Sequence, residues 1–287
     1  MKETWGSFTK EKDFLVCVDS DGCAMDTMDI KHIKCFGPCM VEEWGLEEWK
    51  EPILKRWNEI NLYQKTRGIN RFKALALILT EIDHNYVRVE DLDSLVYWAD
   101  HAKELSNQSV ETEAERLDSV SLRKALAWSK AVNSRIKELP EEGKKPFEGV
   151  KEALEEIHKY ADIAIVSSAN RQAVLDEWEK EHILEYTDVV MAQDCGSKAH
   201  CIEMLKKEGY KENHILMVGD APGDLQAARV NQVMFYPILV KKEKESWDEL
   251  RTQGLDAFLN ERYQGEYEQE KEDAFNKNLS GSRSFRK

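Results

Sequence analysis

The stretch FLVCVDSDG, residues Phe14–Gly22, decides how this chain folds. Its first five residues, Phe14–Val18, are a continuous run of bulky and partly β-branched side chains. Such a run is typical of a strand that is buried on both faces of a parallel sheet. The residues that follow, Asp19 to Gly22, favour a turn and end the strand. Two carboxylates at the end of a buried strand are costly unless a cation or an incoming charged group compensates them.

After residue 146 the sequence alternates between short apolar runs and amphipathic stretches. A helix is expected around Phe147–Ile157, followed by strands at Ile163–Val166, Val189–Met191, Ile215–Val218 and Val233–Tyr236 with helices near Gln172–Lys180, Lys198–Glu208 and Leu225–Val230 between them. This alternation predicts a parallel sheet covered by helices, which is an α/β fold. Because Phe14–Val18 has no strand near it in the sequence, we expect it to join that sheet.

From about Met28 to Leu139 the apolar residues recur at three- and four-residue spacing, and no strand pattern interrupts them. The pattern predicts an all-helical domain, residues 28–139, inserted into an α/β core made of residues 1–27 and 140–287. The tryptophans of this domain are expected to pack in its interior. Near the C-terminus, Trp247 to Phe258 predicts one or two amphipathic helices, and a frayed end is expected beyond about Glu266.

The composition excludes several classes of protein. The 287 residues include 55 acidic and 41 basic ones, a net charge of −14. Such a surface repels phosphate backbones and anionic lipid, so we expect no nucleic-acid partner and no membrane partner. No apolar run is long enough to span a bilayer, and no signal-peptide pattern is present. The six cysteines match neither a zinc site nor a disulfide framework, which favours a cytoplasmic protein with reduced thiols.

Polar segments follow four of the expected elements. They are Asp19 to Gly22 with Asp26-Thr27, Ser167 to Asn170, Lys198 at the start of a helix, and Gly219 to Asp224. The carboxyl ends of parallel strands meet at one edge of a sheet, where ligands bind in α/β proteins. Each segment alone has an ordinary explanation: a solvated turn, a helix N-cap, or a surface lysine. Their order and placement together predict a site.

The sequence resembles the haloacid dehalogenase superfamily of aspartate-dependent phosphohydrolases. The resemblance rests on FLVCVDSDG (Phe14–Gly22) with Asp26-Thr27, IAIVSS (Ile163–Ser168), Lys198 and ILMVGDAPGD (Ile215–Asp224), with PFEGVKEAL (Pro146–Leu154) leading back into the core. It implies a Rossmann-like parallel sheet with a helical cap domain between the first and second motifs, where the all-helical stretch lies.

The resemblance also implies roles for particular residues. Asp19 is the nucleophile that forms an aspartyl phosphate, and Asp21 is the general acid that later activates water. Ser167 hydrogen-bonds the phosphoryl group and Lys198 balances its charge, while Ser168 and Asn170 are further candidates for substrate contact. Mg²⁺ suits such an all-oxygen site. Its implied ligands are the Asp19 carboxylate, the Asp21 backbone carbonyl and Asp220, with Asp224 as a second ligand or an outer partner.

The expected activity is that of a magnesium-dependent phosphatase for a small phosphorylated metabolite, like a phosphoglycolate phosphatase. An aspartate at position 21 favours phosphoryl transfer over dehalogenation, because a halide leaves without protonation. A sugar-phosphate mutase, a phosphonate hydrolase using a cap lysine such as Lys55 or Lys65, and a non-catalytic phosphate-binding protein remain alternatives. In the cap, Arg67 and Arg71 lie in a polar loop and are candidates for contacting a second anionic group.

Overall fold

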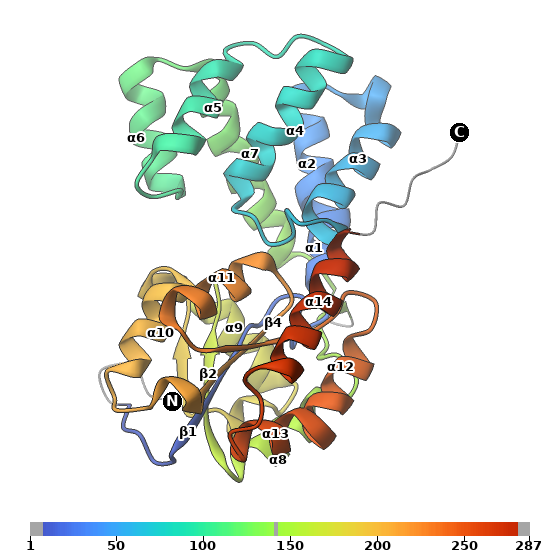
Figure 1. Ribbon diagram of the computed structural model, residues 1–287. Coiled ribbons are helices and arrows are strands. Elements are labelled where there is room, and N and C mark those ends of the chain that lie inside the picture. Colours follow the sequence, from blue (N-terminus) through green and yellow to red (C-terminus); the bar gives the residue numbers. More distant parts are fainter. Residues whose placement is uncertain (1–7, 141–142, 281–287) are drawn as a thin grey trace. The chain divides into compact units, whose positions relative to one another are not determined.

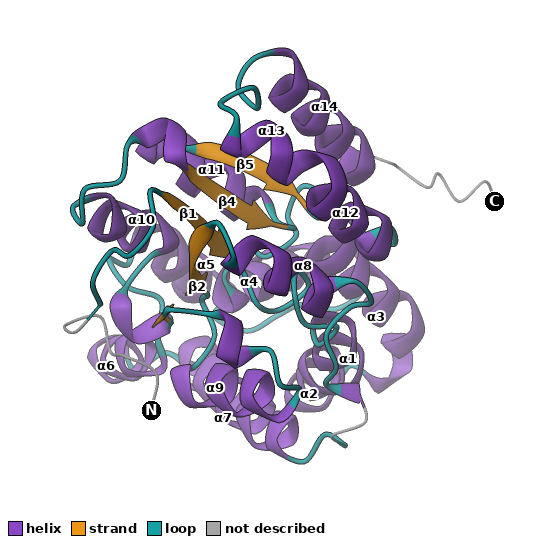
Figure 2. Ribbon diagram, turned by 90° about the horizontal axis from the view of Figure 1, so that it is seen from below, coloured by secondary structure: helices purple, strands orange, loops and turns teal. Residues whose placement is uncertain are grey.

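The computed structural model describes residues 8–140 and 143–280. Its sheet has five parallel strands in the order β3-β2-β1-β4-β5, which are β1 (Phe14–Val18), β2 (Ala161–Val166), β3 (Val189–Met191), β4 (Ile215–Gly219) and β5 (Met234–Pro237). The strand from the N-terminal motif, β1, lies at the centre and pairs with both β2 and β4 (Figure 2). The predicted α/β fold with a parallel sheet is confirmed.

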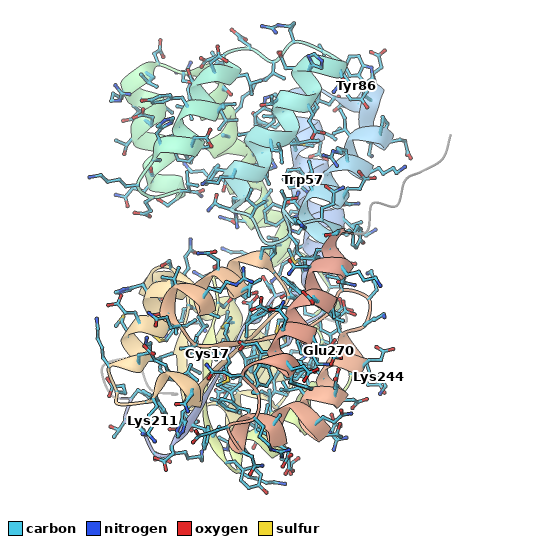
Figure 3. All side chains as sticks on the ribbon, viewed as in Figure 1. Cys17, Trp57, Tyr86, Lys211, Lys244 and Glu270 are labelled. Carbon is cyan, nitrogen blue, oxygen red and sulfur yellow. The ribbon has the colours of Figure 1, made fainter. Side chains whose placement is uncertain are left out.

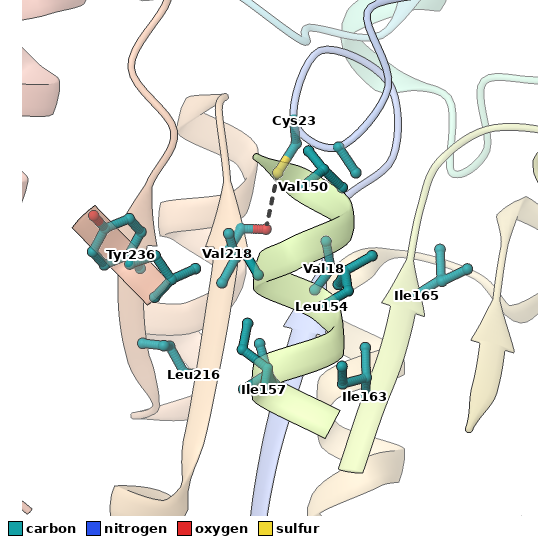
Figure 4. Packing of buried hydrophobic residues seen from close by; sticks show 14 of the residues in the cluster. Val18, Cys23, Val150, Leu154, Ile157, Ile163, Ile165, Leu216, Val218 and Tyr236 are labelled. Carbon is teal, nitrogen blue, oxygen red and sulfur yellow. Dashed lines mark hydrogen bonds between the residues drawn. The ribbon is translucent and has the colours of Figure 1, made fainter. Parts of the chain in front are cut away.

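In the described part of the chain, seven α-helices follow the helical domain in sequence and accompany this sheet. They are α8 (Val150–His158), α9 (Arg171–Lys180), α10 (Lys198–Lys206), α11 (Pro222–Asn231), α12 (Glu243–Glu249), α13 (Leu255–Leu259) and α14 (Glu266–Ser280) (Figure 1). Alternate strand residues, such as Val18 and Val218, pack against Val150, Leu154 and Ile157 of α8 (Figure 4). The full burial of the strands explains their continuous apolar sequences.

The chain divides into two compact units. One consists of Met1–Met28 with Glu141–Lys287, and the other of Asp29–Pro140. The boundary between the units falls between Pro140 and Glu141, and residues 141–142 lie outside the described part of the chain.

The helical unit is built around an aromatic core. Its helices are α1 (Met28–Lys31, which begins at the last residue of the other unit), α2 (Gly37–Trp44), α3 (Lys50–Asn58), α4 (Arg71–Asn85), α5 (Leu92–His101), α6 (Asn107–Leu117) and α7 (Val120–Lys137). Trp57, which Figure 3 labels within the helical unit, is fully buried. Trp128 is fully buried as well, and the two ring centroids lie 6.0 Å apart in an edge-to-face arrangement. Trp128 Nε1 donates to the carbonyl of Phe36 at 3.1 Å, so this polar group is satisfied inside the core.

The C-terminal segment differs from the sequence expectation. From Glu266 to Ser280 the chain forms the 15-residue helix α14, not a frayed end, and residues 281–287 lie outside the described residues. Phe275 packs edge-to-face on Phe235 of β5 with 5.3 Å between ring centroids. Glu268 Oε1 accepts a hydrogen bond from Phe235 N at 3.3 Å, and the Tyr263 hydroxyl donates to Phe235 O at 2.7 Å. Side chains therefore bind the backbone N–H and carbonyl of Phe235 at the outer edge of β5. In an exposed edge strand these groups would be left without a partner.

Among the helices of the described residues, none combines enough length with enough apolar character to span a bilayer. All six cysteines, which lie within the described residues, carry free thiols.

Candidate active site

The polar segments singled out in the sequence lie beyond the carboxyl ends of neighbouring strands. Asp19 directly follows β1, Ser167 follows β2 and Asp220 follows β4, while Lys198 is the first residue of α10 after β3. Because β1, β2 and β4 are parallel and adjacent, these segments meet at one edge of the sheet. The side chains of Asp19, Ser167 and Asp220 are buried there.

The centre of the site is a lysine held between two carboxylates. Lys198 Nζ lies 2.8 Å from Asp19 Oδ1 and 2.5 Å from Asp224 Oδ1. Burial raises the pKa of the Asp19 carboxyl well above its usual range; Lys198 opposes this rise, while Asp224 and Asp220 add to it. Burial alone would lower the pKa of Lys198, but the two carboxylates more than offset this and raise it. Lys198 therefore stays protonated.

Asp224 is fixed by contacts to both of its oxygens. Oδ1 receives the Lys198 ammonium, and Oδ2 accepts a hydrogen bond from Ala221 N at 3.0 Å at the start of α11. The close approach of this side chain requires a glycine at the end of β4. A Cβ atom on Gly219 would lie 2.4 Å from the Asp224 side chain. Gly219 therefore lets Asp224 reach Lys198.

Asp21 lies in the turn after β1 and has a specific partner. The Thr27 hydroxyl donates to Asp21 Oδ1 at 2.5 Å. The turn itself is closed by Gly22 N, which donates to Met25 O at 2.8 Å. Thr27 is fully buried, so its hydroxyl holds the Asp21 carboxyl from a fixed position. In the sequence, Thr27 stands out only as part of a motif, and its position one residue after Asp26 gives no signal of this contact.

Three carboxylates fit a divalent cation. Asp19, Asp220 and Asp224 are buried, and each offers an oxygen that lies within 4.8 Å of the others. Hard, oxygen-only donors match the preference of Mg²⁺. Mutual repulsion among the three carboxylates contributes to the raised pKa of Asp19, and a bound cation would relieve it.

The segment after β2 combines a buried hydroxyl with a helix cap. Ser167 is buried, and its Oγ accepts from Ala169 N at 3.1 Å. Ser168 is exposed. The Asn170 side-chain oxygen accepts from Gln172 N at 3.0 Å and from Ala173 N at 3.3 Å, so it forms the N-cap of α9.

The two arginines expected to contact substrate belong to the helical unit. Arg67 is buried, and its Nη1 donates to Leu62 O at 2.7 Å within the same turn. Arg71 is half-buried at the start of α4. Its Nη1 donates to Ser129 Oγ at 3.2 Å and to Asn133 Oδ1 at 2.8 Å, and its guanidinium lies over the Phe36 ring at 5.0 Å.

Comparison with known proteins identifies the family. The sequence profile of the haloacid dehalogenase-like hydrolases matches residues 69–238. Among solved structures, a haloacid dehalogenase-like hydrolase from Streptococcus pneumoniae superimposes with a TM-score of 0.51 at 14% identity, covering 78% of this chain and 83% of the other. A protein described as a predicted phosphatase from Clostridium acetobutylicum gives a TM-score of 0.48 at 13% identity, covering 86% and 100%. No curated protein matches. The profile match spans more than half of the chain, and the chain therefore belongs to the haloacid dehalogenase-like hydrolase family.

Proposed function

We propose that this hydrolase is a magnesium-dependent phosphatase that cleaves a small phosphorylated metabolite through an aspartyl phosphate on Asp19. One observation carries the proposal. The Asp19 carboxylate directly follows the central strand, lies 2.8 Å from the Lys198 ammonium, and is clustered with the buried carboxylates of Asp220 and Asp224. A carboxylate is a weak nucleophile, so charge neutralisation and in-line positioning supply most of the rate enhancement.

The residues of this chain divide the work in the following way. Asp19 attacks phosphorus while Lys198 offsets the negative charge of the phosphoryl oxygens. Asp21 protonates the leaving oxygen and then takes a proton from the water that hydrolyses the aspartyl phosphate. The Thr27 hydroxyl keeps the Asp21 carboxyl in one orientation. Ser167 donates a hydrogen bond to the phosphoryl group from the end of β2.

Asp224 is better suited to orienting Lys198 than to binding the cation. Both of its oxygens already accept hydrogen bonds, one from Lys198 and one from the α11 N-terminus. We assign the cation to Asp19, Asp220 and the Asp21 backbone carbonyl. When bound, Mg²⁺ supplies electrostatic stabilisation of the phosphoryl oxygens.

Arg71 is the better candidate for contact with a second anionic group of the substrate. Within the described residues, the contacts of Arg71 are to neutral groups: the Ser129 hydroxyl, the Asn133 amide oxygen and the Phe36 ring. Burial without a carboxylate partner lowers its pKa to about 10. Arg71→Ala is expected to reduce kcat/KM for a substrate with a second anionic group and to spare acetyl phosphate.

The test is phosphate release from p-nitrophenyl phosphate and acetyl phosphate, with Mg²⁺ and after its removal with EDTA. Wild type should turn over only with the metal. Asp19→Asn preserves the shape of the side chain but removes the nucleophile, so it should fold normally and show no turnover. Retained steady-state activity in Asp19→Asn would refute the nucleophile assignment. Transfer of phosphate between substrate hydroxyls, without net release, would identify a mutase instead.

A further inference from the structure

Two buried tryptophans reach the loop between Asp19 and Met25 from separate helices. Trp178 of α9 donates its indole N–H to Ser20 Oγ at 2.9 Å. Trp247 of α12 donates its indole N–H to the Cys23 carbonyl at 3.0 Å. Both indoles are fully buried in the core of the α/β unit. Two hydrogen bonds from the core thus fix the loop that carries the two proposed catalytic aspartates.

Backbone hydrogen bonds to Ser20 close the turn in this loop. The Ser20 carbonyl accepts hydrogen bonds from Cys23 N at 3.3 Å, Ala24 N at 3.0 Å and Met25 N at 2.8 Å. These bonds close the turn but do not fix it to the rest of the unit. Asp19 N, which donates to Val218 O at 3.0 Å, anchors one end to β4. Cys23, within the turn, also lies against Val218, with its Sγ 3.6 Å from that carbonyl (Figure 4).

The side chain of Ser20 lies between Asp19 and Asp21 in the sequence. The bond to Trp178 directs the Ser20 side chain into the core, and this fixes the residue that joins the two aspartates. An indole N–H can only donate, and each of the two buried indoles has its acceptor in the loop. Each tryptophan therefore sets the position of one loop atom, Ser20 Oγ or Cys23 O.

We propose that Trp178 and Trp247 are positioning residues that hold the Asp19–Met25 loop in its reactive geometry. This inference rests on the proposed phosphatase function, since the loop carries the proposed nucleophile and general acid. Neither tryptophan touches the reacting atoms in this scheme. They act through the loop, and their removal should slow the chemical step more than it weakens substrate binding.

The first experiment compares Trp178→Phe and Trp247→Phe with the control Tyr263→Phe. The control removes one buried hydrogen bond to a backbone carbonyl, that of Phe235, in the same unit but away from the loop. Each tryptophan variant should lose about tenfold in kcat on p-nitrophenyl phosphate, with KM within about twofold. Tyr263→Phe should keep the wild-type kcat. Equal kcat in all four proteins would overturn the proposal.

Because phenylalanine is smaller than tryptophan, a cavity could also slow the reaction. Replacing each indole with a benzothiophene side chain keeps the shape and substitutes sulfur for the N–H. The same loss of kcat is expected if the hydrogen bond is responsible, and wild-type kcat would overturn the proposal. Adding Ser20→Ala to Trp178→Phe should lower kcat little further, because both changes remove the same hydrogen bond. Fully additive losses would contradict that coupling.

Amide hydrogen exchange tests the same idea without any turnover. The amides of Cys23, Ala24 and Met25, which donate to Ser20 O, should exchange faster in both tryptophan variants than in wild type and Tyr263→Phe. If wild type releases no phosphate, the proposed function fails, but faster exchange would still support the two anchors. Unchanged exchange of these amides would refute the anchors whatever the activity.

Discussion

Gly219 is the residue at which the smallest change should have the largest effect. A Cβ atom at this position would lie 2.4 Å from three atoms of the Asp224 side chain, which is fully buried. Gly219→Ala must therefore displace Asp224 and, with it, the Lys198 ammonium. We expect a loss of about 1–3 kcal/mol in unfolding free energy. A misplaced charge at the site should also lower kcat on the order of 10²-fold.

The matched control for this change is Gly223→Ala, four residues further along. Nothing lies within 4 Å of a Cβ atom at Gly223, which belongs to α11. Alanine is a better helix former than glycine, so this variant should be as stable as wild type or slightly more so. Urea denaturation and phosphate release would be measured on both variants. Similar effects of the two changes would show that the contact with Asp224 is not the cause.

The sequence could predict which segments meet at this site but not how they contact one another. Asp19, Ser167, Lys198 and Asp220 were placed together because parallel strands end at one edge of a sheet. The sequence alone shows no side-chain geometry, so it could not decide whether Asp224 binds a cation or holds Lys198. It also gave no signal for Trp178 and Trp247, because each meets the loop across more than one hundred intervening residues.

At the scale of elements, Asp91 joins the starts of α5 and α7. Its Oδ1 accepts from the Ser94 hydroxyl at 2.5 Å, and its Oδ2 accepts from the Ser119 hydroxyl and from Ser121 N. Burial pushes the pKa of this carboxyl upward, but these donors outweigh it and the pKa lies below its usual value. The charged form is thus favoured in the folded state, and it connects two helices.

Asp91→Asn tests this junction through its pH dependence. Asparagine tolerates the positive φ of 54° at this position but presents a weaker acceptor. A lowered folded-state pKa gives stability that is present above the unfolded pKa and is lost as pH falls through the folded one. Near neutral pH, the free energy of unfolding of wild type should exceed that of the variant by about 1 kcal/mol. The difference should shrink below about pH 4, where the unfolded carboxyl gains its proton.

Urea denaturation followed by circular dichroism at several pH values would measure this difference. Other titrating groups are common to both proteins, so they cancel in the comparison. A difference that stays constant from neutral pH to the lowest usable pH would contradict the role of the Asp91 charge.

Helix α14 shows why part of the C-terminal segment escaped prediction. Tyr267, Lys271, Phe275 and Leu279 recur every four residues and share one helix face. Lysine in the middle of this face interrupts the apolar pattern that indicates an amphipathic helix. In the structure the Lys271 ammonium pairs with Glu249 and lies 4.9 Å from the Tyr267 ring centroid. The aliphatic part of the side chain is therefore buried while its charge is paired.

The strands, with continuous apolar runs, were predicted to within two residues at each end.

At the scale of the whole molecule, α14 should determine whether the protein stays soluble. Truncation after Gly265 removes Phe275 and Leu279 from the core and uncovers the edge of β5. Burial of two such side chains contributes about 3–6 kcal/mol. The truncated protein should melt at lower temperature and associate through the open edge. Size-exclusion chromatography and thermal denaturation would measure both effects.

Truncation after Ser280 is the control, because it keeps every α14 contact named above. This shorter deletion should leave the melting temperature and the elution volume unchanged. If truncation after Gly265 left both the elution volume relative to mass and the melting temperature as in wild type, α14 would be dispensable for the sheet.

The central position of β1 has a consequence for synthesis on the ribosome. Phe14 pairs with Ala161 and Leu15 with Ile215, so the entire helical unit is translated before either neighbour of β1 exists. Local contacts form quickly, and pairing across long separations forms slowly. The nascent chain can therefore complete its helical unit while the FLVCV segment remains apolar and unpaired. The segment that ends in the proposed nucleophile is then a natural target for a chaperone during translation.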